Sequence, residues 1–178
     1  MRAWLVLLAS SLAVCRGGPS GSVFSIDDFG AVPTENSLEA ALSNGAALTA
    51  ALEAAHAAGR GTVILPANVT YYSLPFSGNG HVGVNLVVDG TLKACNLRAC
   101  QDSWSNDSKH FDYFFQWNNG TDLTLEGEGV IDGQGWIWWS QFLVGRLPGD
   151  MKRPGLVYLT EGSGLTVANI TLKNSPIM

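Results

Sequence analysis

Three segments of the chain share one pattern. They read VNLVVDGTLKA (84–94), TDLTLEGEGVIDGQG (121–135) and SGLTVANITLKNS (163–175). Each opens with a polar residue and Leu, alternates through a short strand, turns at Gly or Asn and begins a second strand, and we place Leu86, Leu123 and Leu165 at the same position of this pattern. Short strands that recur in this way predict a solenoid of stacked β coils, with loop insertions that make the spacing unequal. An ordinary β-sandwich of similar strands is the alternative.

Two helical stretches precede the repeats. The first covers about 37–43 and ends at Asn44-Gly45, and the second covers 46–58 and ends at Gly59. A terminal repeat needs a cover with a polar outer face, so these helices are expected to cap the first coil. They lie between the opening run GSVFSIDDFGAV and a predicted buried strand, GTVILP. His56 is expected to be a partly exposed helix residue rather than a ligand.

The composition supports a β-rich chain and excludes one class of partner. Gly accounts for 21 of the 178 residues, charged residues make up 14%, and the net charge is −5. This balance favours a turn-rich β protein with one domain. The basic residues are scattered, with only Lys152 and Arg153 adjacent, so we expect no nucleic-acid partner.

The N-terminus reads MRAWLVLLASSLAVCRGG, with one basic residue before an apolar run that is too short to span a bilayer. We expect a signal peptide over residues 1–17, followed by a single domain over 18–178 and secretion to the cell exterior or cell wall. A retained membrane anchor is one alternative. Lipidation of Cys15 is another, although Val14 stands where a lipoprotein motif would have a small residue. No other stretch could cross a membrane, so no membrane contact is expected once the signal is cleaved.

The remaining cysteines and four sequons fit this compartment. Cys95 and Cys100 are expected to pair in an oxidising environment, with two free thiols as the alternative. A zinc site would require further Cys or His ligands, so we expect no metal, and we expect no other cofactor. The predicted glycosylation sites are Asn68, Asn106, Asn119 and Asn169.

Taken in order, five motifs resemble the start of glycoside hydrolase family 28, the polygalacturonases and their relatives. They are SIDDFGAV, GRGTVILPANVTYYSLPF, VNLVVDGTLKA, GVIDGQGWIWW and KRPGLVYLTEGSGLTVANITLKNSP. The resemblance runs from Phe24 to the last residue and is closest to plant-like members. It implies an all-β, right-handed parallel β-helix of the pectin lyase-like kind with a short N-terminal helical cap. It also implies a secreted enzyme, monomeric if complete, that hydrolyses the α-1,4-galacturonan of pectin with inversion.

The resemblance assigns no catalytic residue to this chain. An inverting glycosidase needs a general acid and a general base about 6.5 to 9.5 Å apart. The family's Asn-Thr-Asp, Asp-Asp, Gly-His-Gly and Arg-Ile-Lys motifs are expected after the position of the segment NSP. The similar segments here, NGTD (119–122), Asp27-Asp28 and GHVG (80–83), lie out of place. The chain is therefore expected to be an N-terminal fragment, truncated on its C-terminal side, with an apolar coil end that promotes aggregation.

Other acidic residues and the tryptophans have structural interpretations as well as functional ones. Asp132 and Asp89 precede Gly and are expected to be turn residues, while Glu126 and Glu128 could face one another. The three tryptophans of the WIWW segment either stack on sugar rings or anchor a loop, and packing is the commoner use of large aromatics; they are Trp136, Trp138 and Trp139. A non-catalytic polysaccharide-binding or structural module is the second hypothesis. A third keeps the β-helix but changes the chemistry to another pectin-active hydrolase or a lyase, and the carboxylate cluster by which such lyases commonly hold Ca²⁺ is missing from the sequence.

Overall fold

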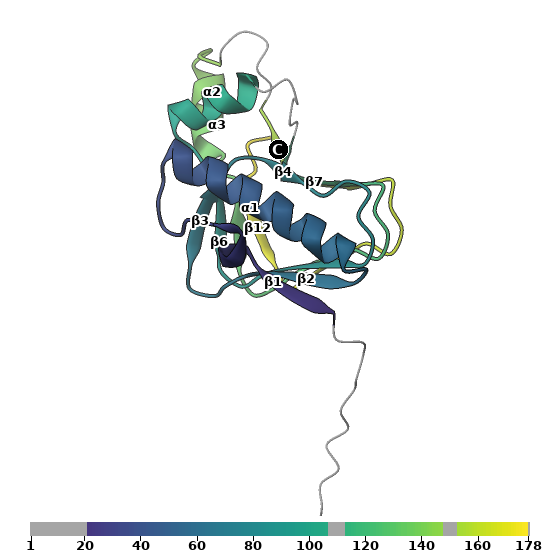
Figure 1. Ribbon diagram of the computed structural model, residues 1–178. Coiled ribbons are helices and arrows are strands. Elements are labelled where there is room, and N and C mark those ends of the chain that lie inside the picture. The colour runs from purple at the N-terminus through teal and green to yellow at the C-terminus, as the bar shows by residue number, and fades with distance from the viewer. Residues whose placement is uncertain (1–20, 107–112, 148–152, 178) are drawn as a thin grey trace, which may run out of the picture.

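The structure is a computed structural model that describes residues 21–106, 113–147 and 153–177. The predicted signal peptide, 1–17, lies outside the described residues, as do the side chains of 104–106. The strands of the described part form three parallel sheets, and the chain passes from one sheet to the next as it winds through successive coils (Figure 1). The predicted fold class, an all-β parallel β-helix with an N-terminal helical cap, is confirmed.

Each coil contributes a strand to each sheet in turn. Sheet A has the order β1-β2-β5-β8-β11, with bounds Ser22–Ser25, Gly61–Leu65, Val84–Val88, Thr124–Glu126 and Thr166–Ala168. Sheet B has the order β3-β6-β9-β12, with bounds Thr70–Ser73, Thr91–Ala94, Val130–Asp132 and Thr171–Lys173. Sheet C has the order β4-β7-β10, with bounds Phe76–Ser77, Tyr113–Asn118 and Gly155–Thr160.

The register corrects one detail of the predicted repeat. Leu86 pairs with Leu125, and Leu125 pairs with Val167. Leu123 and Leu165 therefore lie two residues before the partners of Leu86, at the preceding inward-facing position of their coils. The prediction that Leu86, Leu123 and Leu165 are equivalent was wrong by two residues. Because side chains in a strand alternate with a period of two, a shift of two residues keeps the same side chains facing inward, and the apolar pattern does not distinguish the two registers.

The cap is one helix rather than two. After the 3₁₀ turn η1 (Ile26–Phe29), the helix α1 runs from Leu38 to Ala57 without a break at Asn44. The fully buried Asn44 side chain accepts a hydrogen bond from the Val32 amide (2.6 Å) and donates to the carbonyls of Val32 (3.0 Å) and Tyr72 (2.7 Å). A Cβ on Gly45 would lie 3.4 Å from the Leu74 carbonyl oxygen. The Asn-Gly pair is therefore a packing feature in which the helix approaches the strands closely.

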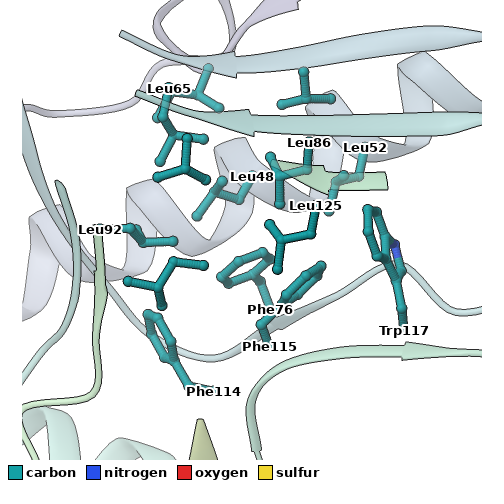
Figure 2. Close-up of a cluster of buried hydrophobic side chains, with 14 of the residues drawn as sticks. Leu48, Leu52, Leu65, Phe76, Leu86, Leu92, Phe114, Phe115, Trp117 and Leu125 are labelled. Carbon is teal, nitrogen blue, oxygen red and sulfur yellow. The ribbon is translucent and has the colours of Figure 1, made fainter. Parts of the chain in front are cut away.

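Stacked apolar columns fill the interior beneath α1 (Figure 2). In sheet A one column is formed by Val63, Leu86, Leu125 and Val167. In sheet B another is formed by Tyr71, Leu92, Ile131 and Leu172. Leu48 and Leu52 of α1 pack against this core from the N-terminal side (Figure 2). In both columns the inner members are fully buried, whereas Val167 and Leu172 of the last coil are 48% and 42% exposed.

Two insertions leave the solenoid at the corner between sheets B and C. They carry α2 (Arg98–Asn106) and α3 (Trp136–Leu143), which lie together near one end of α1 (Figure 1). Gln141 of α3 donates a hydrogen bond to the Gln101 side chain of α2 (3.1 Å). Cys95 and Cys100 form a disulfide with an S–S distance of 2.03 Å at the start of the first insertion. Within the described residues, none of the helices has the length and apolar character that crossing a membrane would require.

Candidate functional site

Polar side chains follow three successive strands of sheet B where the chain turns towards sheet C. Asn96 follows β6, Gln134 follows β9 and Asn174 follows β12. Asn96 donates to the Gln134 side chain (3.4 Å) and accepts a hydrogen bond from Asn36 before α1 (3.5 Å). We call Asn36, Asn96 and Gln134 the amide ladder. Their contacts link the cap region to the third coil.

Asp132 joins this corner to the last coil. Its carboxylate, on a residue only 6% exposed, accepts hydrogen bonds at Oδ1 from the Gln134 amide (3.0 Å) and the Asn174 side chain (2.9 Å). Its Oδ2 lies 3.7 Å from the Lys173 ammonium. Gln134 and Asn174 both have left-handed backbone conformations, with φ of 52° and 53°, which the carboxylate helps to hold. The expectation that Asp132 is a turn residue agrees with these contacts, which occupy the carboxylate that a general acid would need free.

The segment Ser175–Ile177 is held between α3 and the start of β10. The Trp139 indole N–H donates to the carbonyl oxygens of Ser175 (3.1 Å) and Pro176 (3.0 Å). The Arg153 guanidinium also donates to the Pro176 carbonyl (3.4 Å), and the Ile177 amide donates to the Pro154 carbonyl (3.1 Å). Residues far apart in sequence therefore meet at one end of sheet C, next to the Asp132 corner.

Replacing Trp139 by Phe is expected to lower the free energy of unfolding by about 1 to 2 kcal/mol, because two carbonyl oxygens lose their shared donor. A smaller aromatic ring replaces the indole, so part of the packing is kept. Urea unfolding followed by circular dichroism measures the change. Trp136→Phe is the matched control, since Trp136 is 57% exposed and its replacement should have an effect within about 0.5 kcal/mol. Equal effects of the two substitutions would contradict an anchoring role for Trp139.

The three tryptophans therefore have different environments. Trp138 is 2% exposed and belongs to the hydrophobic core, which agrees with the packing interpretation and leaves its ring covered by protein rather than open to a sugar. Trp139 is partly buried and uses its indole N–H on the Ser175–Pro176 segment. Trp136 is the exposed member of the set. The three side chains differ in exposure because they point in different directions around the axis of one short helix.

Two aromatic contacts flank the start of β10, and the sequence pattern did not reveal them. Tyr113 of β7 and Tyr158 of β10 stack with ring centroids 4.3 Å apart and planes at 12°, and Tyr158 is 37% exposed. The Arg153 guanidinium lies 4.2 Å from the ring centroid of Phe142, which is 55% exposed. We call these four residues the aromatic surface. Pairing of β7 with β10 brings Tyr113 and Tyr158 together, and no local sequence signal encodes that pairing.

The carboxylates singled out in the sequence have structural partners. Asp27 accepts a hydrogen bond from the Tyr71 hydroxyl (2.7 Å), and burial, together with this bond, raises the pKa of Tyr71. Asp89 accepts from the Glu128 amide (3.2 Å), and Glu126 accepts from Asn85 (2.7 Å). None of these contacts brings two carboxyl groups together. Among the described residues, no group of three or more His, Cys, Asp or Glu could hold a metal ion.

The histidines and Asp122 complete the set of sequence candidates. Asp122 of the NGTD segment forms an exposed ion pair with Arg60 (3.8 Å). His81 of the GHVG segment is 3% exposed and stacks on His56. His56 is a partly exposed residue of α1, as expected, and the structure adds a contact with a loop that lies 25 residues later in the sequence.

The described sequons lie on exposed turns. Asn68, Asn119 and Asn169 are exposed and have left-handed backbone conformations, with φ of 62°, 55° and 55°. The side chain of Asn106 lies outside the described residues. Glycosylation at these four positions stays a prediction.

Comparison with known proteins agrees with the parallel β-helix. The chain is 32% identical to a polygalacturonase of Chamaecyparis obtusa over 165 residues, covering 88% of this chain and 29% of that protein. It is 31% identical to the probable endo-xylogalacturonan hydrolase A of Aspergillus fumigatus over 168 residues, covering 92% of this chain and 34% of that protein. The chain thus spans about a third of the length of these relatives.

A solved structure shows the same fold. The hyperthermoactive exopolygalacturonase of Thermotoga maritima superposes with a TM-score of 0.64 and 18% identity, over 86% of this chain and 42% of that one. The sequence model of glycosyl hydrolases family 28 matches residues 57–178, which is more than half of the chain. Because this family model covers more than half of the chain, the chain belongs to glycosyl hydrolases family 28.

Proposed function

We propose that this chain is the N-terminal part of a secreted polygalacturonase-like hydrolase that cleaves pectic polysaccharide with inversion at the sugar carbon. The observation that carries the proposal is the family match, which extends through the Asp132 corner to the end of the chain. The similarity to a polygalacturonase over 88% of the chain supports the substrate class. Polygalacturonan and xylogalacturonan are both candidate substrates, because relatives named for each align over most of the chain.

The catalytic acids are proposed to come from coils that follow β12 in the whole enzyme. An inverting mechanism needs two carboxyl groups about 6.5 to 9.5 Å apart, one of them free to protonate the leaving oxygen. Asp27, Asp122 and Asp132 are instead engaged with Tyr71, Arg60 and the turn after β9. The exposed inward-column residues Val167 and Leu172 are where a further coil would pack.

The aromatic surface is proposed to contact the polysaccharide. Exposed rings can stack against sugar faces, and the Arg153 guanidinium supplies a positive charge beside the exposed Phe142. Pectin is anionic and the chain carries a net charge of −5, so attraction must come from such local cations. Secretion through the 1–17 signal and glycosylation at the four sequons belong to the same proposal.

The first test is to sequence the transcript through codon 178 and to express the whole reading frame. We expect the extended protein to release reducing ends from polygalacturonate or xylogalacturonan and to form the inverted anomer, detected by NMR early in the reaction. Arg153→Gln should raise KM more than it lowers kcat, because Arg153 would bind the substrate without taking part in bond cleavage. Absence of hydrolysis on every pectic substrate would refute the proposed activity.

A second candidate, a binding module without catalysis, is supported by the exposure of Trp136, Phe142 and Tyr158. It predicts that the 178-residue chain binds oligogalacturonides without releasing reducing ends, as isothermal titration would detect. Arg153→Gln should weaken that binding, with Lys93→Gln as the control, because Lys93 also carries a positive charge over an aromatic ring, that of Tyr72, but is not one of the four residues of the aromatic surface. A titration with no heat of binding would eliminate this candidate.

A further inference from the structure

The cap helix and the first coil meet at a pair of histidines. His81 lies in the corner that joins β4 to β5, and His56 lies in the last turn of α1. Their rings stack with centroids 5.0 Å apart and planes at 15°, and His81 is 3% exposed. This contact ties the C-terminal end of the cap to a turn of the solenoid.

The Nδ1 atoms of both histidines are placed to act as acceptors. The Nδ1 of His56 accepts a hydrogen bond from the Val82 amide (3.1 Å). The Nδ1 of His81 is buried without a hydrogen-bond partner, and so is the Nε1 of Trp117. A Cβ on Gly78 would lie 2.6 Å from the first of these nitrogens and 2.4 Å from the second. Both nitrogens therefore lie beside Gly78. The indole nitrogen of Trp117 can only donate a hydrogen bond, so the neighbouring Nδ1 of His81 suits it when it carries no proton and can accept, and does not suit it when His81 is protonated.

The surrounding charges do not compensate a protonated pair. Burial, followed by the effect of His56, holds the pKa of His81 below its ordinary value, while Glu53 on α1 acts in the opposite direction. Arg60, whose side chain packs near Gly83 at the end of the same corner, forms an exposed ion pair with Asp122. A proton on each ring would place two positive charges on rings whose centroids are only 5.0 Å apart.

We propose that His56 and His81 form an acid-sensitive latch, closed when the His81 ring is neutral, that fixes the end of the cap helix to the corner formed by residues 78–83. Protonation of His81 breaks the stacked pair and frees the Val82 amide from His56. The adjoining contacts of that corner, Thr121 amide to His81 carbonyl (3.0 Å) and Gly83 amide to Thr121 carbonyl (2.9 Å), then loosen as well. Because the pKa in the folded state is lowered, the latch contributes fully above about pH 6.5. Its contribution is lost as the pH falls from there towards the lower folded-state pKa.

Hydrogen exchange of the 178-residue chain at pH 7.5 and pH 5.0 tests the latch. After correction for intrinsic exchange rates, we expect protection of the Val82 amide to fall by roughly fivefold or more at the lower pH. The Leu86 amide in β5 should change less. His81→Phe keeps an aromatic ring but cannot be protonated, so it should remove most of the pH dependence. His110→Gln, which changes the third histidine of the chain, should leave it intact.

Two outcomes overturn the proposal. One is protection of Val82 that does not change between the two pH values, and the other is an unchanged pH dependence in His81→Phe. If His81→Phe does not fold, NMR titration of the histidine rings in the unsubstituted chain decides the question. The latch requires His81 to titrate below about pH 6.5, and a value at or above that figure refutes it.

Discussion

Replacing Leu125 by Ala is expected to lower the free energy of unfolding by about 3 to 5 kcal/mol. Leu125 is fully buried in the middle of the sheet A column, with Leu86 on one side and Val167 on the other. Neighbouring coils are held apart by their ladder hydrogen bonds, so they cannot collapse into the space that the missing side chain leaves. Equilibrium unfolding in urea, fitted to a two-state transition, measures the loss.

Val167→Ala is the matched control, because Val167 occupies the same column one coil later and is 48% exposed. We expect it to cost less than about 1 kcal/mol, since the residue buries little surface that it could lose. Similar effects at the two positions would mean that the last coil is covered in solution, either by another copy of the chain or by a rearrangement of its own residues. That result would contradict the exposed last coil.

Asn44→Ala is expected to destabilise the protein by about 3 to 5 kcal/mol, although Ala is the better helix former. The substitution removes the side chain that bonds three part-buried backbone groups, the amide and carbonyl of Val32 and the carbonyl of Tyr72. Each unpaired buried group costs about 1 to 3 kcal/mol. Thermal unfolding should show a midpoint lower by several degrees, at about 2 to 4 °C per kcal/mol for a chain of this size.

Ser43→Ala serves as the control for Asn44, because Ser43 lies next to it in α1 and is only half-buried. The change raises helix propensity without removing the contacts to Val32 and Tyr72, so stability should stay the same or rise by a few tenths of a kcal/mol. If Asn44→Ala were as well tolerated as Ser43→Ala, the hydrogen bonds of Asn44 would have no net value for stability. The continuity of α1 across the Asn-Gly pair would then need another cause.

The repeated pattern was sufficient to predict the solenoid, because period-two strands that recur with turns have few other packing solutions. It was not sufficient to fix the register, as the pairing of Leu86 with Leu125 shows. The Asn44-Gly45 pair has the chemistry of a helix end, and it was predicted as one. The part-buried backbone groups that Asn44 bonds come from segments 12 and 28 residues away, so nothing near the pair in sequence reveals its role.

In the candidate site, too, some contacts could be predicted from the sequence and others could not. Asp132 could be assigned to a turn because Asp before Gly forms local hydrogen bonds, and its bond to the Gln134 amide spans only two residues. Its second bond, to Asn174, spans 42 residues and depends on the stacking of β9 with β12. The separate environments of Trp136, Trp138 and Trp139 likewise depend on what packs around α3.

By itself, the sequence determined the elements whose causes are local: the alternating strands, the turns at Gly and Asn, the helical character of the cap, and the family to which the ordered motifs belong. The tertiary structure decided the exact stacking of the coils, the unbroken course of α1, the joining of Tyr113 to Tyr158, and the meeting of His56 with His81. Each of these rests on contacts between residues distant in the chain. Parallel coils bring such residues together only once every strand has its register, and the alternation of apolar residues leaves that register open by steps of two.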